Sequence, residues 1–469
     1  MGLNPLCGAG LNLHWLSFLI ESLSNEKNIF IPVFTGDFYI IIIWSPFGGI
    51  LRECSRRGGF CFEKNIKNGI TAVIIENHNS PVVSAQIWVK VGSINETKDT
   101  SGLSHFLEHL IFKGSKNYPG DMMTRLTETQ GGVINAATSK EFTQFHIDIV
   151  KEKTDEAIKM LCDAMENAVF PIEEIEKERP VVIEEIVRHD DSPDAVLYEM
   201  LNKTLFIKTP YRDSVIGSSD VIKNVSREKI KHYYKSHYTP SNMFVIIAGD
   251  INSKDVLGTV ETTFGKIKRS KPPAEPALIE KIHKPVVEKT SKNVEHTYFM
   301  SGFLGPTANS SEQFAADIVS SILGGGRSSR LVKNLREDKK LVYGIGASFW
   351  SQRGSGIFAV SATFDPKNEQ QVLNEIKREL DNLAENGPTD EELSRVKEMT
   401  ISQWVFANET AHDKASLYGY WHIEGNPKMA ETYLDGIRKT TREDLKHFLK
   451  KHYLPQGLNR VSIEPKSKN

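Results

Sequence analysis

A segment that occurs twice constrains the fold more than any other feature of this chain. SREKIKHYYKSHYTP at 226–240 and TREDLKHFLKKHYLP at 441–455 carry the same residue at eight of fifteen positions without a gap. Both copies end in His-Tyr-x-Pro, and in both a predicted helix is followed by a predicted strand. Two unrelated amphipathic helices would rarely agree at so many positions, so the chain is predicted to contain two copies of one domain.

Length and composition agree with a soluble two-domain protein. A chain of 469 residues is too long for one compact core. Its net charge is −2, with acids and bases interspersed, which indicates neither nucleic-acid binding nor attraction to an anionic membrane surface. No CxxC pair occurs among the cysteines, which argues against thiolate-bound zinc and against a disulfide framework. The four cysteines are Cys7, Cys54, Cys61 and Cys162.

The first 59 residues differ from the rest and are predicted to be an extension outside the fold. Residues 29–51 are almost uncharged, but their unbroken apolar part, 38–44, is far shorter than the about 20 residues of a spanning helix. The first lysine is Lys27, whereas a secretory signal begins with a basic region. We therefore expect a cytoplasmic protein, which would be exported only if the extension is a leader.

From about Phe62 onward the pattern predicts clusters of strands and helices. Clusters without strict alternation indicate α+β layers. The Lys- and Pro-rich stretch at 268–276 indicates a linker, which gives domains at 60–267 and 285–469 on either side of 268–284. The predicted strands are 70–76, 82–92, 142–150 and 242–250, and the predicted helices are 101–113, 154–168 and 172–189.

Two histidines and a glutamate lie within the short segment SHFLEH at 104–109. On a helix, His105 and His109 share one face with Cβ atoms about 5–6 Å apart, close enough for both imidazoles to bind one zinc ion. Histidines at this spacing also occur as surface pairs. Here apolar neighbours such as Phe106 and Leu110 place the pair against a core, where polar groups need partners such as a metal.

Glu108 precedes His109 and could hold a water beside the ion without binding the ion itself. Zinc lowers the pKa of a bound water toward about 7. Glu108 would then take the proton as general base and later pass it to the leaving amine as general acid.

A hydrolytic zinc site usually has three protein ligands, so one ligand is still required. The predicted helix at 172–189 offers six glutamates. The local pattern favours Glu178 and Glu185, which are seven residues apart and share a face that is partly lined by Val181 and Val182. Spacing alone does not choose between the carboxylates, which are Glu173, Glu174, Glu176, Glu178, Glu184 and Glu185.

The chain resembles the HxxEH inverzincins, and more closely the pitrilysin/insulinase family of zinc metallopeptidases, in the branch of the processing peptidases. The resemblance extends from about Phe62 to the C-terminus. It depends on GLSHFLEHLIFKGS, GGVINAATSKEFTQF (131–145), EKERPVVIEEI (176–186) and LGGGRSSRLVKNLREDKKLVYGIGA (323–347). It implies two homologous domains, each a mostly antiparallel sheet covered by helices on one face.

The resemblance also assigns roles to individual residues. It makes His105 and His109 ligands of one Zn²⁺ per chain, with Glu108 as the base. It makes Glu185, 76 residues after His109, the third ligand. It also implies that Glu178 does not bind the metal itself but helps to orient the ligands.

Further roles implied by the resemblance concern the substrate. Asn135 and Ala136 match a strand edge along which an extended peptide binds through its backbone. In the second copy, Gly and Ser occupy the ligand positions and Gln403 stands opposite Glu185, so that copy would have lost its metal. It keeps Arg336 and Tyr343, which the resemblance places in the active site from the opposing half to hold substrate and the oxyanion.

The sequence thus predicts a zinc-dependent metalloendopeptidase that acts on peptides or unfolded segments. Larger family members carry four such domains, so we expect this chain to form a homodimer, or a heterodimer with a paralogue. Two alternatives are a scaffold subunit of the same fold and a peptide-binding partner that needs another subunit for catalysis. The segment LGGGRSS at 323–329 has no Lys-Ser/Thr ending, and we interpret it as a flexible flank and not as a phosphate loop.

Overall fold

The computed structural model describes residues 29–35, 38–44, 50–52 and 60–466. In the N-terminal part, β1 (Ile29–Thr35), β2 (Phe38–Trp44) and β3 (Ile50–Arg52) form a three-stranded antiparallel sheet. The remainder of the predicted extension lies outside the described residues, so its role as a leader stays a prediction.

The first half of the chain is built on a six-stranded sheet in the order β4-β5-β9-β6-β8-β7. Neighbouring strands are antiparallel except β5 and β9, which are parallel. β7 is therefore a terminal strand. The strands are β4 (Phe60–Asn65), β5 (Thr71–Glu76), β6 (Val82–Val89), β7 (Val133–Thr138), β8 (Thr143–Val150) and β9 (Met243–Gly249).

The second half repeats this topology in a five-stranded sheet of order β10-β14-β11-β13-β12. The order and the strand directions match those of β5-β9-β6-β8-β7, including one parallel pair, β10 with β14. The predicted duplication and the two-domain α+β fold are therefore confirmed. The strands are β10 (Val287–Lys292), β11 (Thr297–Gly305), β12 (Gly344–Trp350), β13 (Gly356–Phe364) and β14 (Asn459–Pro465).

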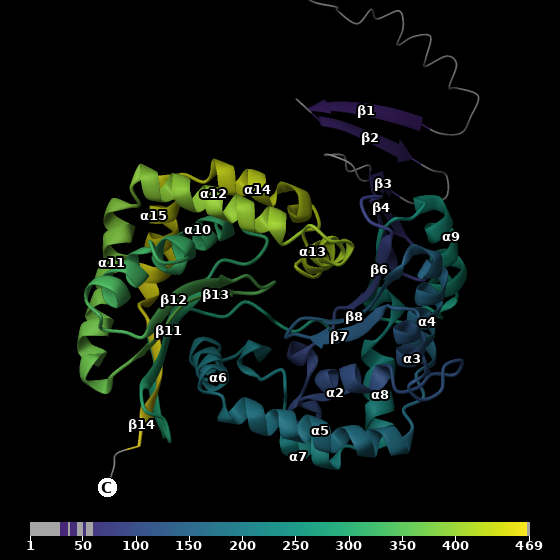
Figure 1. Cartoon of the computed structure of the whole chain (residues 1–469), viewed down its shortest axis with the longest axis horizontal. Helices are drawn as coiled ribbons and strands as arrows, with labels where there is room; N and C mark the ends of the chain where they lie inside the picture. Colours follow the sequence, from purple (N-terminus) through teal and green to yellow (C-terminus); the bar gives the residue numbers. More distant parts are fainter. Residues whose placement is uncertain (1–28, 36–37, 45–49, 53–59, 467–469) are drawn as a thin grey trace, which may run out of the picture.

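Helices of each half cover one face of its own sheet (Figure 1). In the first half these are α2 (Leu103–Ile111), α3 (Met122–Thr129), α4 (Thr154–Asn167), α5 (Ile172–Asp191), α7 (Ser219–Asn224), α8 (Arg227–His237) and α9 (Ser253–Thr263). In the second half they are α10 (Gln313–Gly324), α11 (Glu369–Asn386), α12 (Asp390–Phe406), α14 (Met429–Lys439), α15 (Arg442–Phe448) and α16 (Leu454–Gln456), with the π-helix η7 (Val332–Asp338). The segments predicted from sequence as strands and helices are all present, with ends that differ by a few residues.

The repeated segment begins in the same way in both halves. Ser226 caps α8 by accepting a hydrogen bond from the backbone of Lys229, and Thr441 caps α15 by accepting one from the backbone of Asp444. Each helix leads through the shared His-Tyr-x-Pro region into the strand that pairs in parallel, β9 or β14. The similarity in sequence therefore marks equivalent positions in the two sheets.

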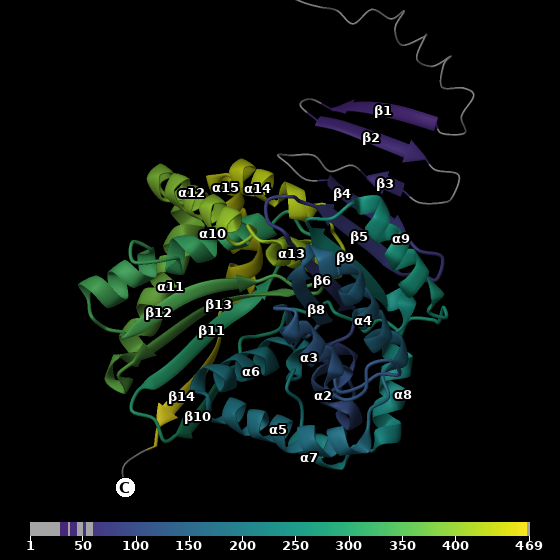
Figure 2. The same cartoon turned by 45° about the vertical axis from the view of Figure 1, so that its right-hand side comes forward.

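In addition, one helix of each half packs on the sheet of the other half, on the face that the sheet's own helices leave uncovered (Figure 2). The helix α6 (Pro193–Leu205) packs on β11 and β14, with Leu201 buried among their side chains. In return, α13 (Ala411–Ile423) packs on β6 and β9, where Gly419 lies against the ring of Trp88. A Cβ on Gly419 would lie 2.2 Å from that ring, so the close approach requires glycine. We predicted helices on one face of each sheet only. This exchange places a helix on the other face as well.

Residues 268–286 connect the halves without regular secondary structure. Glu280 within this stretch is buried and accepts hydrogen bonds from the backbone of Lys208 and Thr209 in the first half. The domain limits given above stay a prediction. In the part of the chain that the structure describes, no helix combines the length and the apolar character needed to cross a bilayer.

Candidate metal centre and active site

The helix that carries the HxxEH segment is fixed on its apolar side and at its first turn. Leu103, Phe106 and Leu110 of α2 are fully buried in the core of the first half. The buried carboxylate of Glu96 accepts hydrogen bonds of 2.7 Å from the backbone N–H groups of Gly102 and Ser104. Burial raises the pKa of Glu96 to about 7 despite these bonds. The core and this carboxylate together orient the two histidines.

The two histidines of α2 and one carboxylate of α5 converge on a common point. Oε2 of Glu185 lies 3.5 Å from Nε2 of His105 and 3.4 Å from Nε2 of His109. The three donor atoms are all within 4.8 Å of one another, and the imidazole rings meet edge to face. The structure thus brings together all three residues that the resemblance implies as zinc ligands.

A second carboxylate of α5 holds His109 from the opposite side of its ring. Nδ1 of His109 lies 3.2 Å from Oε2 of Glu178, which leaves Nε2 directed at Glu185. Lys113 pairs with the other Glu178 oxygen at 2.6 Å. Burial alone would raise the pKa of Glu178, but the hydrogen bonds from Lys113 and His109 outweigh it and lower the pKa. Such a contact fixes the orientation and tautomer of a metal-binding imidazole.

The donor set fits a zinc ion. Two imidazole nitrogens and a carboxylate oxygen are common zinc ligands, and histidine binds metals as the neutral ring. Burial, together with the neighbouring His109, lowers the pKa of His105 to about 4, so this ring is neutral near pH 7. The buried Nδ1 of His105 has no hydrogen-bond partner among the described residues.

Glu108 lies beside this cluster and contacts the end of β7. Oγ1 of Thr138 donates a 2.5 Å hydrogen bond to Oε2 of Glu108, which orients the carboxylate. Burial raises the pKa of Glu108 above its usual value, although the Thr138 hydrogen bond and the charge of His109 oppose this rise. A partly buried carboxyl with a raised pKa is suited to moving protons near neutral pH.

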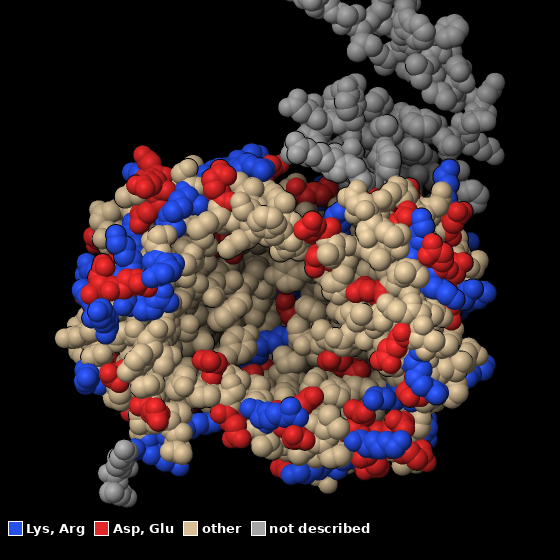
Figure 3. All heavy atoms as spheres, in the orientation of Figure 1, with Lys and Arg blue, Asp and Glu red and all other residues tan. Residues whose placement is uncertain are grey.

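The predicted substrate edge is the outer side of β7. Asn135 and Ala136 pair with β8 on one side only, because β7 ends the sheet. The side chain of Asn135 accepts a 2.9 Å hydrogen bond from the N–H of Ala136, and Val133 on the same strand is 57% exposed. β7 borders the hollow between the two halves, whose visible surface is largely uncharged (Figures 1 and 3). An extended chain could pair with such an edge.

Arg336 and Tyr343 lie in the second half, and the structure does not bring them to the histidines of the same chain. The guanidinium of Arg336 pairs with Glu337 at 2.7 Å. Tyr343 is 57% exposed, and its hydroxyl donates a 3.1 Å hydrogen bond to Asp365. Both side chains are therefore held by residues of their own half.

In the second half the helix between β11 and β12 is α10, and the glycines of LGGGRSS lie at its end. Gly324 at the end of α10 lies so close to β12 that an added Cβ would be 2.0 Å from the backbone nitrogen of Ala347. Gln403 lies on α12. Gly324 thus allows the helix to pack closely on the strand, a role that the interpretation of this segment as a flexible flank did not include.

Three neighbours of the site were not among the residues predicted from the sequence. Lys113 is four residues after His109, a helical spacing that could have revealed it. Glu96 and Thr138 are brought to the site only by the tertiary fold and leave no local pattern. Of the two valines expected beside Glu178 and Glu185, Val182 is buried and Val181 is 41% exposed.

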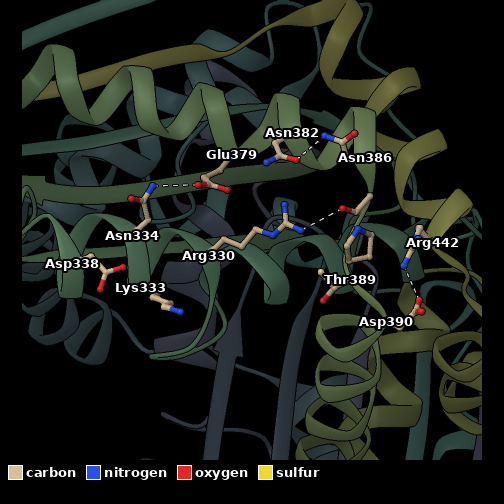
Figure 4. A pocket seen from close by; sticks show the side chains of 12 residues that line it. Arg330, Lys333, Asn334, Asp338, Glu379, Asn382, Asn386, Thr389, Asp390 and Arg442 are labelled. Carbon is tan, nitrogen blue, oxygen red and sulfur yellow. Dashed lines mark hydrogen bonds and ion pairs between the residues drawn. The ribbon is translucent and has the colours of Figure 1, made fainter.

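A pocket of about 700 Å³ lies on the outside of the second half and contains none of these residues (Figure 4). Several of its polar and charged groups are paired within the chain. Arg442 pairs with Asp390 at 2.7 Å, and Asn334 donates a hydrogen bond to Glu379. Arg330 is held by Glu392 at 2.7 Å. Lys333 and Asp338, one charge of each sign, also line the pocket and do not indicate a particular ligand.

Comparison with protein families assigns the chain to a known group. Residues 71–219 match the family described as insulinase (peptidase family M16), and residues 224–400 match the one described as peptidase M16 inactive domain. The two matches together span more than half of the chain. The protein therefore belongs to the insulinase family of peptidases, M16.

Individual relatives agree with this assignment. The chain is 28% identical over 353 residues to the "Uncharacterized zinc protease YmxG" of Bacillus subtilis, which is 75% of this chain and 86% of the relative. It is 29% identical over 315 residues to the "Uncharacterized zinc protease SCO5738" of Streptomyces coelicolor, covering 66% and 69% of the two chains. The crystal structure of a protease from Helicobacter pylori has a TM-score of 0.82 at 26% identity and covers 87% of this chain and 100% of its own.

Proposed function

We propose that this protein is a zinc-dependent metalloendopeptidase that hydrolyses peptides or unfolded segments. The observation that carries the proposal is the convergence of His105, His109 and Glu185 within 4.8 Å, with Glu108 directly beside them. The relatives named zinc proteases support the choice of metal and reaction.

The proposed roles follow from the positions of the side chains. His105, His109 and Glu185 hold one zinc ion, and Glu178 fixes His109 in the orientation that directs Nε2 to the ion. Zinc supplies a Lewis acid at this position and lowers the pKa of water into the neutral range. Glu108, oriented by Thr138, accepts the proton of the attacking water and delivers it to the departing amine.

Substrate recognition is assigned to the edge of β7. An extended peptide pairs with the backbone near Asn135 and Ala136, and the Asn135 side chain gives up its contact with the Ala136 N–H when the peptide binds. Backbone pairing depends little on the side chains of the substrate. Chains held in compact folds cannot offer a free strand, so peptides and unfolded segments are favoured.

The proposal includes a dimer in which each active site uses both chains. Arg336 and Tyr343 are held within their own half and are not directed at the zinc ligands of the same chain. We assign them to the site of a partner chain, identical or paralogous, where they bind the substrate and the developing oxyanion. A scaffold subunit is the second candidate function, because the second half lacks a counterpart of the HxxEH site. The retention of Glu108, which a scaffold does not need, favours the enzyme.

The test is cleavage of a quenched fluorescent peptide by the purified full chain. Cleavage should be lost with a chelator, return with zinc, and fall by at least about 100-fold in Glu108→Gln. That variant should keep its zinc, which separates loss of the base from loss of the metal. A zinc-loaded wild-type chain that cleaves no unstructured peptide would reject an enzyme that works as a homodimer and favour a scaffold or a subunit that needs another chain.

A further inference from the structure

A second cluster of metal-binding side chains lies where the two halves meet. His146 and Asp148 are two residues apart on β8 and therefore share one face of the strand. This face is opposite to the one that carries Phe145 and Ile147 in the core of the first half. His412, in the first turn of α13, reaches the same place from the second half.

The three side chains are close enough to share one ion. Nδ1 of His412 lies 2.9 Å from Oδ2 of Asp148, and Nε2 of His146 lies 3.9 Å from the same oxygen. The two imidazole rings are 4.6 Å apart, edge to face, and one donor atom from each residue lies within 4.8 Å of the others. The pair of histidines of the HxxEH site has a closely similar arrangement.

An ordinary ion pair accounts for only part of this cluster. It explains the contact of His412 with Asp148, but it leaves His146 without a hydrogen bond. His146 is 8% exposed, its buried Nδ1 has no partner among the described residues, and Oδ1 of Asp148 is buried and unpaired as well. Buried polar atoms normally have partners, and leaving them unpaired is costly.

Two of the three groups have protonation states that suit a metal, whereas the hydrogen bond with Asp148 raises the pKa of His412, which must lose its extra proton to bind an ion. Burial lowers the pKa of His146, which therefore offers a neutral imidazole. Burial alone would raise the pKa of Asp148, but the hydrogen bond from His412 outweighs it, so the pKa is lowered and the carboxylate stays ionised. Two imidazoles and one carboxylate form a ligand set that zinc and related divalent transition metals accept, with a further position open to water.

We propose that His146, Asp148 and His412 form a second site for a divalent transition metal such as zinc, which joins α13 to the sheet of the first half. This ion is additional to the one assigned to the HxxEH site. The two sites are separate. His146 lies opposite Asn135 on β7, whereas Glu108 contacts Thr138, three residues further along the same strand. Asn135 and Thr138 are therefore roughly 10 Å apart, and their side chains point to opposite faces of the sheet.

The decisive measurement is the number of zinc ions per chain after loading and gel filtration of the full-length protein. The wild type should hold one ion more than His412→Gln, which keeps an N–H donor for Asp148 but is a poor zinc ligand. His447→Gln is the matched control, since His447 also pairs with a carboxylate, Glu312, and should leave the zinc content unchanged.

Thermal unfolding gives a readout that is independent of the HxxEH site. In the variant His105→Ala/His109→Ala, zinc should still raise the melting temperature, and adding His412→Gln should abolish the increase. If His412→Gln leaves the zinc content of an otherwise wild-type chain unchanged, the second site is refuted, whether or not the double variant folds. If the wild type holds a single ion that His412→Gln removes, the second site stands and the HxxEH assignment is the one that fails.

Discussion

Among single residues, Glu178 decides how well His109 can serve as a ligand. One oxygen of its carboxylate contacts Nδ1 of His109, and the other pairs with Lys113. The imidazole therefore keeps one orientation, in which Nε2 is directed toward His105 and Glu185. The contact acts on the metal only through His109. Its loss should weaken zinc binding without removing a ligand.

We therefore predict that Glu178→Ala lowers the affinity for zinc by about 10- to 100-fold. The measurement is zinc titration against a competing chelator. Glu184→Ala is the control on the same helix, because the side chain of Glu184 is 69% exposed and pairs with Arg188 on the surface. Equal affinities of Glu178→Ala and the wild type would mean that Glu178 does not orient the ligand.

At the scale of elements, the position of α2 depends on a close backbone approach at its N-terminus. Gly102 has φ of +91°, a conformation that residues with a Cβ rarely adopt. An added Cβ would lie 2.9 Å from the carbonyl oxygen of Ile216 and 3.1 Å from Gly217. This contact and the carboxylate of Glu96 fix the first turn of the helix that carries His105.

Gly102→Ala should accordingly destabilise the chain by about 1–3 kcal/mol and weaken zinc binding, since the backbone must shift at the start of α2. Denaturant unfolding and zinc titration measure the two effects. Gly258→Ala in α9 is the matched control: a Cβ there meets nothing within 4 Å, and its effect should be neutral or stabilising by up to about 1 kcal/mol. Similar losses for both variants would contradict this view of α2.

The same elements show what could be predicted from sequence. Local periodicity predicted α2, α5 and β8, and helical spacing alone was enough to place His105 and His109 on one face of a helix. The partner carboxylate is 76 residues away from His109, so the local pattern favoured Glu178 and Glu185 without choosing between them, and only the resemblance selected Glu185. The exchange of α6 and α13 could not be predicted, because an amphipathic helix does not reveal which of two similar sheets it covers.

At the scale of the whole molecule, the contact between the halves contains a buried acid that should make stability depend on pH. Glu424 at the end of α13 is 1% exposed and lies near Glu141 of the first half, which also contacts Arg353. Burial and the charge of Glu141 raise the pKa of Glu424 well above its ordinary value of 4.5. At neutral pH the folded chain therefore binds a proton there that the unfolded chain has lost.

Because the folded state holds the extra proton, this group lowers stability as the pH rises above about 4.5 toward its folded pKa. Glu424→Gln removes that titration. We expect the melting temperature of the wild type to fall more than that of Glu424→Gln between pH 6 and about pH 8.5. Parallel curves for the two proteins would show that Glu424 is ionised in the folded state.

The proposed sharing of active sites is also a property of the assembled molecule. Mixing Glu108→Gln with Tyr343→Phe should restore activity, because one site of each mixed dimer combines an intact Glu108 with an intact Tyr343. Random pairing at equal amounts gives about one quarter of the wild-type activity. Glu108→Gln mixed with the double variant Glu108→Gln/Tyr343→Phe is the control and should stay inactive. Equal inactivity of both mixtures would exclude sharing between chains.

The central claim is that one zinc ion is held by His105, His109 and Glu185 next to the carboxylate of Glu108. The most direct measurement is anomalous X-ray diffraction at the zinc absorption edge from zinc-loaded crystals of Glu108→Gln, in which the ligands are intact and turnover is blocked. We predict an anomalous peak about 2.0–2.2 Å from Nε2 of both histidines and from an oxygen of Glu185. Ordered side chains at these three positions without a peak between them would contradict the account.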